Sequence, residues 1–119
     1  MSANTSANAQ APASCCASVA ARRITDDQAG TLAAVFKALA DPSRVRIVNM
    51  LANAPESTCV CELTDALGLS QPTVSFHVKK LMLAGLVRRE QHGTWAHYSL
   101  DREAFAHVAQ AFESEGGRR

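Results

Sequence analysis

The sequence of 119 residues contains no apolar run near the roughly 18 residues that a membrane-spanning helix needs. Its first residues also lack the basic start and apolar segment of a secretory signal. We therefore expect a cytoplasmic protein with no membrane partner. Thiols stay reduced in that compartment, so the four cysteines are expected to act as ligands or redox groups rather than as a disulfide framework.

Motifs typical of enzymes are also missing. The sequence has no glycine-rich phosphate loop, no H-E-x-x-H zinc motif and no G-x-S-x-G nucleophile elbow, and nothing places a cysteine beside a histidine as a nucleophile–base pair. The sequence therefore predicts a protein that is not an enzyme. It has no internal repeat, and its length suffices for one domain.

Positive charge is concentrated in one part of the chain, although the net charge is only +1. Residues 70–98 contain two lysines and two arginines against a single glutamate, which gives this segment a local charge of +3. Phosphate binding depends on local rather than total charge, so this segment is compatible with a nucleic-acid partner.

Apolar spacing and capping residues predict five helices between residues 25 and 113. Asp41-Pro42 is a start signal for the second helix and Gly68 a stop signal for the third, while Ser70 and Asp101 are expected to cap the fourth and fifth. The apolar faces of the five helices are marked by Leu32, Val35, Phe36 and Leu39; Ile47, Val48 and Leu51; Val60, Leu63 and Leu67; Val74, Val78 and Leu81; and Phe105, Val108 and Phe112.

Between the last two helices, residues 86–91 and 94–99 read as two strands around the turn His92-Gly93. The third and fourth helices form a helix-turn-helix, and the hairpin after them adds a wing. The predicted fold class is therefore mainly α with a small β-hairpin wing, a winged helix-turn-helix over residues 25–113. Residues 1–24 are expected to form a flexible arm that carries one cysteine pair, and residues 114–119 a tail.

The fourth helix presents a polar, basic face opposite its buried stripe. Glutamine pairs with adenine, serine and threonine serve several bases, and lysine contacts phosphates, so this face suits double-stranded DNA. Phe76 is expected to touch a thymine methyl group or a second subunit, and His77 to act as an orienting hydrogen-bonding group. Two wing arginines should contact the DNA backbone. The candidate DNA-binding residues are Ser70, Gln71, Thr73, Ser75, Phe76, His77, Lys79, Lys80, Arg88 and Arg89.

Cys59-Val60-Cys61 stands at the start of the third helix, where exposed N–H groups favour the thiolate, a soft metal ligand. In a regular helix, residues i and i+2 point about 200° apart. We therefore expect both thiols to hold one ion only if the first turn unwinds, or if one of them joins Cys15 and Cys16. The candidate metal ligands are Cys15, Cys16, Cys59 and Cys61.

At these residues the chain resembles the ArsR/SmtB family of winged-helix repressors. The resemblance covers about residues 35–100 and rests on the segments FKALADPSR (36–44), CVCEL (59–63), LSQPTVS (69–75) with His77, and AGLV (84–87). It implies a homodimer joined through the first and last helices, which binds a two-fold operator and releases it on capturing a metal or metalloid.

Within that family, Cys-Val-Cys at this position resembles the sensors of arsenite and antimonite, and also those of cadmium and lead, which add cysteines from an arm. The adjacent pair Cys15-Cys16 is more similar to the arsenical type. We predict a homodimeric repressor that leaves a palindromic operator on binding trivalent arsenic or antimony, with the arm pair and one of Cys59 and Cys61 as three sulfur ligands.

Three alternatives remain open. One is a repressor that responds to Cd²⁺ or Pb²⁺ through four sulfurs, another is a repressor that senses thiol oxidation, and the third is a winged-helix interaction module that does not bind DNA. The carboxylate and histidine site of the zinc and nickel branch is not expected, because only Asp101, Glu103 and His107 fall near its region.

Overall fold

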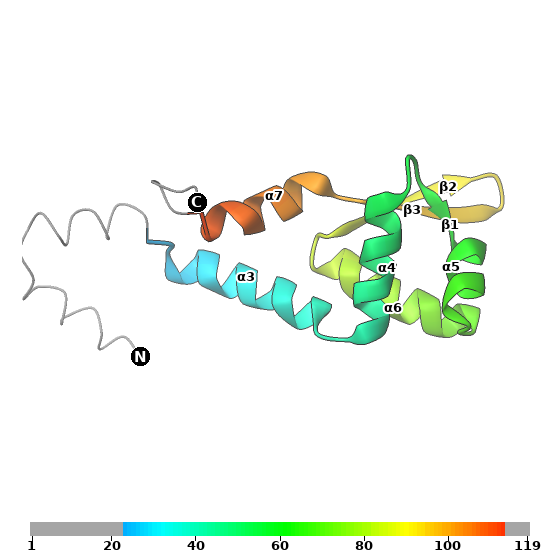
Figure 1. The fold of residues 1–119 in the computed structure, drawn as a ribbon, viewed down its shortest axis with the longest axis horizontal. Coiled ribbons are helices and arrows are strands. Elements are labelled where there is room, and N and C mark those ends of the chain that lie inside the picture. The colour runs from blue at the N-terminus through cyan, green and yellow to red at the C-terminus, as the bar shows by residue number, and fades with distance from the viewer. Residues whose placement is uncertain (1–22, 114–119) are drawn as a thin grey trace, which may run out of the picture.

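The computed structural model describes residues 23–113 (Figure 1). Its elements are α3 (Asp26–Leu39), α4 (Pro42–Asn53), β1 (Thr58–Cys59), α5 (Val60–Leu67), α6 (Gln71–Leu83), β2 (Val87–His92), β3 (Trp95–Leu100) and α7 (Arg102–Ala111). Helices α5 and α6 form the helix-turn-helix, and β2 and β3 form the wing. The predicted fold class is thus confirmed. Nearly all of the predicted arm and the whole predicted tail lie outside the described residues.

The helices begin and end at the residues that the sequence marks as caps. Asp41 accepts hydrogen bonds from the backbone N–H groups of Ser43 (2.8 Å) and Arg44 (3.3 Å) at the start of α4. Gly68 ends α5 in the left-handed region, with φ of 69°, a conformation that glycine adopts at little cost. Ser70 then caps α6 by accepting the N–H of Thr73 at 3.3 Å. Gly68 and Ser70 together fix the tight turn between α5 and α6. None of the described helices is long and apolar enough to cross a membrane.

The core lies where α4, α5 and α6 meet the three-stranded sheet. Its side chains with the least exposure are Ile47, Leu63, Val74, Val78, Leu81 and Leu86. Three of them form the predicted buried stripe of α6, and burying each such side chain contributes about 1.5–3 kcal/mol. This packing holds α6 rigidly with its opposite face outward.

The sheet has the order β1-β3-β2 and is antiparallel throughout. His92 pairs with Trp95, so the two-residue turn consists of Gly93 and Thr94, with φ of 64° at Gly93. The predicted turn and both predicted strands are therefore wrong by one residue, because the glycine takes the first turn position, where φ is positive. Strand β1 is a further difference, since no strand pattern precedes α5 in the sequence.

Helices α3 and α7 run beside each other and project away from the helix-turn-helix (Figure 1). The rings of Phe36 and Phe112 are in contact, with centroids 6.0 Å apart, yet their exposed fractions are 45% and 68%. Val35, which precedes Phe36 in α3, is buried in the core. A groove of about 630 Å³ separates the outer parts of the two helices and is lined by residues that include Leu32 and His107. Much apolar surface therefore stays open on this pair.

Candidate nucleic-acid interface and thiol site

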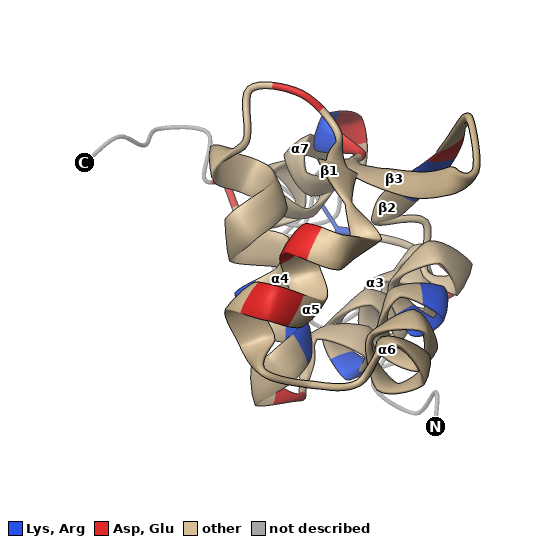
Figure 2. Ribbon diagram, turned by 90° about the vertical axis from the view of Figure 1, so that its right-hand side faces the viewer, with Lys and Arg blue, Asp and Glu red and all other residues tan. Residues whose placement is uncertain are grey.

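Helix α6 exposes the polar face that the sequence predicts. The exposed side chains on it are Gln71, Thr73, Ser75, Phe76, Lys79 and Lys80. Figure 2 shows Lys and Arg on α6 and on the wing, whereas the charged side chains of the neighbouring α5 are all acidic. An anionic duplex is therefore attracted to α6 and the wing rather than to α5.

Phe76 is 54% exposed, and two neighbours hold its ring. The Lys80 ammonium lies 5.3 Å from the ring centroid, within cation–π range. The His77 ring meets the same ring edge-on, with centroids 5.5 Å apart. The aromatic ring thus forms an apolar patch beside a fixed positive charge, a combination that suits contact with a base and its phosphate.

His77 is half-buried and hydrogen-bonded, as expected of an orienting residue. Its Nδ1 lies 3.1 Å from Nη1 of Arg44, and Nε of the same arginine donates to the carbonyl of Ala38 at 2.6 Å. One side chain of α4 therefore ties the C-terminal end of α3 to α6. Sequence reasoning missed Arg44, because the direction of a side chain across a helix contact depends on tertiary packing.

Asp41 lies beside the same group of residues. Desolvation disfavours its charged form, but hydrogen bonds from the N–H groups of Arg44 and Ser43, together with the nearby positive guanidinium of Arg44, outweigh that effect and lower the pKa of Asp41. The carboxylate is therefore stabilised in its ionised form at the start of α4.

The two wing arginines point to opposite faces of β2. Arg89 is paired with Tyr98, whose buried side chain marks the inner face of the sheet, whereas Arg88 is paired with Ser99 on the other face. Arg89 also donates to Oε1 of Gln91 at 2.7 Å. Both arginines are exposed, but only Arg89 lies on the face that packs against the core.

Cys59 and Cys61 come together in a way that the sequence analysis did not foresee. Cys59 is the last residue of β1 and the N-cap of α5, with extended backbone angles (φ −67°, ψ 145°). Its side chain therefore turns back over the first turn of α5, where the two sulfurs are joined in a disulfide and the Cα atoms are 5.2 Å apart. The expectation that the thiols point apart is wrong, because Cys59 precedes the helix.

The same sulfur caps the helix. Cys61 donates its N–H to Sγ of Cys59 at 3.3 Å, and Glu62 Oε1 accepts the N–H of Cys59 at 3.0 Å. Cys59 is 8% exposed and Cys61 is exposed, so the pair is reached from the Cys61 side. Cys15 and Cys16 lie outside the described residues. Within residues 23–113 no group of three or more His, Cys, Asp or Glu side chains is arranged to hold a metal ion.

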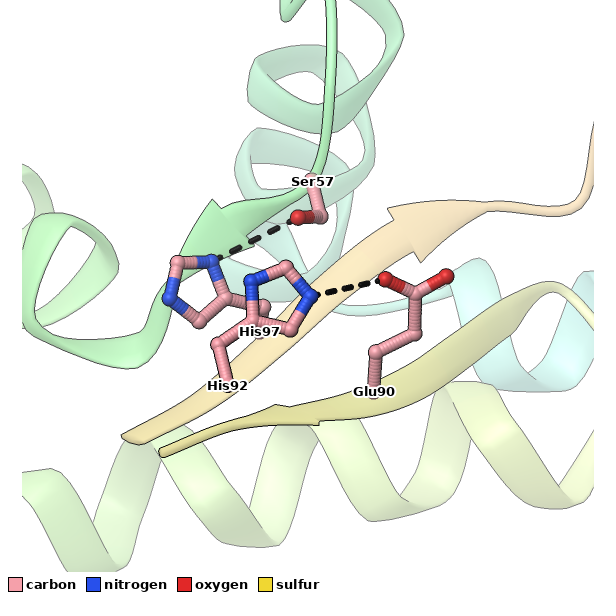
Figure 3. Close-up of polar contacts among 4 residues, drawn as sticks. All are labelled: Ser57, Glu90, His92 and His97. Atoms are coloured by element: carbon pink, nitrogen blue, oxygen red, sulfur yellow. Dashed lines mark hydrogen bonds and ion pairs between the residues drawn. The ribbon is translucent and has the colours of Figure 1, made fainter. Parts of the chain in front are cut away.

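A group of four polar residues near the wing was also missed (Figure 3). Ser57 contacts His97 through Oγ and Nδ1 (3.4 Å), and His92 contacts Glu90 through Nε2 and Oε1 (3.0 Å). The rings of His92 and His97 stack with centroids 4.1 Å apart. The sequence signal for this group is the alternation of side chains along β2 and β3, which places Glu90, His92 and His97 on one face of the sheet.

Known proteins resemble this chain over the region that contains the helix-turn-helix. The helix-turn-helix model described as "bacterial regulatory protein, arsR family" matches residues 41–89, which contain α4, β1, α5 and α6 and the first residues of β2. The arsenic resistance transcriptional regulator ArsR1 of Pseudomonas putida is 46% identical over 58% of this chain and 53% of its own length, so the match spans only about half of that relative. An HTH-type transcriptional regulator of Methanocaldococcus jannaschii is 44% identical over 56% of this chain and 73% of its own length.

Solved structures agree with the fold. HlyU from Vibrio cholerae superposes with a TM-score of 0.63 at 28% identity, over 71% of this chain and 91% of that one. The homodimeric winged helix-turn-helix DNA-binding domain of a possible ArsR-family regulator from Mycobacterium bovis gives a TM-score of 0.61 at 28% identity, over 72% and 82% of the two chains.

Proposed function

This chain belongs to the ArsR family of bacterial regulatory proteins, and on that premise we propose that it is a repressor released from its operator by trivalent arsenic or antimony. The observation that carries the proposal is the convergence of Cys59 and Cys61 at the start of the helix-turn-helix. Relatives named as arsenical resistance repressors, including that of Bacillus subtilis at 43% identity, support the choice of inducer.

The ligand set follows from the chemistry of the sulfurs. Two sulfurs close enough to bond to each other can also turn toward one soft ion, and thiolates are the ligands that such ions prefer. The described residues supply two thiol sulfurs, so a site of three thiolates takes its third from the arm. We therefore revise the expected set: Cys59 and Cys61 both bind, and Cys15 or Cys16 completes the site. Four-sulfur binding of Cd²⁺ or Pb²⁺ is the competing arrangement.

The mechanism uses the double role of Cys59. With the two sulfurs joined, the sulfur of Cys59 accepts the N–H of Cys61 and so caps α5, and we assign the same cap to the reduced, DNA-binding state. When the sulfur binds an ion instead, that N–H loses its partner and the first turn of α5 rearranges. Because α5 packs directly against α6, a rearrangement of α5 shifts α6 relative to the rest of the dimer. A coupling free energy of about 1–3 kcal/mol is typical and would lower operator affinity about 5–150-fold.

A titration tests this proposal. Fluorescence anisotropy of operator DNA should fall when arsenite is added to the reduced wild-type protein, and should stay constant with a Cys59→Ser/Cys61→Ser variant that still binds the operator. A Gln71→Ala variant is the DNA-side control, since losing a base contact should lower operator affinity by about 1–3 kcal/mol and leave non-specific binding intact. Wild type that keeps its DNA at saturating arsenite would overturn the proposal.

The arm variants separate the two ligand sets. If one arm sulfur suffices, Cys15→Ser and Cys16→Ser should each keep most of the response and only the double variant should lose it. If both arm sulfurs bind, each single variant should lose it. X-ray absorption with three As–S bonds supports the three-sulfur site, whereas stronger release by Cd²⁺ through four sulfurs favours the competing arrangement.

A second candidate function is thiol oxidation, favoured by the disulfide between Cys59 and Cys61. Hydrogen peroxide would take two electrons and two protons from the two thiols, forming one S–S bond and two waters. Peroxide added to the reduced protein without metals or metalloids should then release operator DNA, and a thiol reductant should restore binding. Release by arsenite alone, with no response to peroxide, excludes this candidate.

A further inference from the structure

The thiol pair is in register with the wing. In the antiparallel sheet, Cys59 of β1 lies opposite His97 of β3, and His97 in turn lies opposite Glu90 of β2. Residues opposite one another across a ladder project from the same face of a sheet. Cys59, His97 and Glu90 thus form a row across all three strands, on the face opposite the buried Tyr98.

Side-chain contacts continue this row to the tip of the wing (Figure 3). Ser57, two residues before Cys59, contacts His97 at 3.4 Å, and the His97 ring stacks on that of His92 at 4.1 Å and an interplanar angle of 20°. His92 contacts Glu90 at 3.0 Å and is paired with Trp95 across the turn. An unbroken set of contacts therefore joins Ser57, the residue directly before β1, to the residues beside the wing turn.

We propose that this row, centred on His97, transmits ligand capture at Cys59 to the wing, so that the inducer acts on DNA through the wing as well as through α6. The inference rests on the proposed function, because it needs a ligand at the thiol pair. It makes His97 and Ser57 positioning residues that touch neither the ligand nor DNA.

The shortness of β1 makes its pairing with β3 sensitive to the backbone at Cys59. This strand has two residues, and β3 is its only partner in the described sheet. A change in the backbone at Cys59 when its sulfur leaves the α5 cap must therefore move or break the pairing with His97. Stacked rings and a hydrogen bond resist separation, so a displacement of His97 carries His92 and the wing turn with it. Residues of α6 take no part in this route.

Trp95 provides a direct reporter of the wing. It is the single tryptophan of the chain, it is 53% exposed, and it stands at the first position of β3 after the turn. Its emission can be followed in the absence of DNA, so a response of the wing is measured separately from operator release. Arsenite is the probe, added to the reduced full-length protein.

Ser57→Ala and His97→Gln are the test variants, and Ser99→Ala is the matched control. Ser99 projects from the same face of β3 as His97, and its side chain makes no hydrogen bond within residues 23–113. Arsenite should change Trp95 emission in wild type and in Ser99→Ala, and much less in Ser57→Ala and His97→Gln. The arsenite-induced loss of operator affinity should be reduced about two- to thirtyfold in the two test variants. Operator affinity without arsenite should be unchanged.

The outcomes separate the two proposals. Wild type that does not release DNA with arsenite overturns the proposed function and this inference together. Suppose that wild type releases DNA, and that both test variants keep the Trp95 response and the arsenite-induced loss of operator affinity of wild type. That result overturns only the inference and leaves α6 as the sole route. Equal losses in Ser99→Ala and Ser57→Ala also overturn it, because the effect would then come from the sheet in general. Circular dichroism and retained operator binding verify that each variant is folded.

Discussion

Arg44 donates a hydrogen bond to Nδ1 of His77, which fixes the tautomer of the histidine. A guanidinium group has no acceptor, so Nδ1 must accept at 3.1 Å and the ring proton of the neutral histidine sits on Nε2. Helix α6 thus carries a histidine whose outer nitrogen is a hydrogen-bond donor. The same guanidinium holds the carbonyl of Ala38, so the orientation of this donor depends on the position of α3.

Replacing His77 by leucine should lower the free energy of unfolding by about 1–3 kcal/mol, because Nη1 of the half-buried guanidinium loses its acceptor while Nε keeps the Ala38 carbonyl. His77→Asn should cost less, since its amide oxygen can take the place of Nδ1. Urea midpoints measured at one protein concentration check this, with Ser75→Ala as a control on the exposed face of α6. Equal midpoints for the leucine and asparagine variants would contradict the assigned hydrogen bond.

On the wing, we expect Arg89→Ala to weaken DNA binding more than Arg88→Ala does. Arg89 lies on the sheet face that packs toward α6, whereas Arg88 lies on the opposite face with Ser99. Loss of one phosphate contact should lower affinity for all sequences and reduce the salt slope by about 1. Anisotropy titrations across a range of salt concentrations measure both quantities. Salt slopes reduced equally in the two variants would place both arginines on the DNA. A larger reduction for Arg88→Ala than for Arg89→Ala would reverse the assignment.

The exposed contact between Phe36 and Phe112 predicts a two-fold interface built from α3 and α7. Phe112→Glu should weaken the dimer by about 2 kcal/mol or more, or roughly thirtyfold, because a charge would be buried among apolar groups. Sedimentation at micromolar concentration should then show a dimer for wild type and a monomer for the variant. Val45→Glu, at a comparably exposed site on α4, should remain dimeric, and a monomeric wild type would refute the interface.

Asp41 predicts a pH dependence of stability. Its pKa in the folded state lies below the ordinary value of 3.8, so the unfolded chain binds the proton more readily. Its contribution is therefore fully present above about pH 4 and is lost as the pH falls through the lower folded value. Asp41→Asn keeps a capping side chain but cannot titrate. Thermal unfolding should show wild type more stable than the variant at pH 6, with the difference shrinking below pH 4; a constant difference would contradict this.

Local signals explain how much of this structure could be read from the sequence. Asp41-Pro42, Gly68 and Ser70 act on their own neighbouring backbone, so they located three helix ends without any knowledge of packing. The buried stripe of α6 was equally readable from its spacing. The same is true of the outward face that carries the candidate DNA-binding residues.

What the sequence did not reveal depends on contacts between distant segments. Strand β1 exists because Thr58 and Cys59 pair with β3, almost forty positions later in the chain, and two residues carry no strand pattern of their own. Arg44 reaches His77 across a helix contact. The place of Cys59 was the most consequential case. A residue inside the helix would point away from Cys61, whereas Cys59 is the cap and its side chain points toward Cys61.

The cysteine sulfur that caps α5 gives that helix a weak start. Serine, threonine, aspartate and asparagine are the preferred caps, and a sulfur accepts hydrogen bonds less strongly than their oxygens do. The first turn of an eight-residue helix is therefore expected to open more often than its middle, and the amide of Cys61 to exchange its hydrogen faster than amides deeper in α5. Serine at position 59 would close that turn more firmly and slow the exchange, and under the proposed mechanism it would favour the DNA-binding state in addition to removing a ligand.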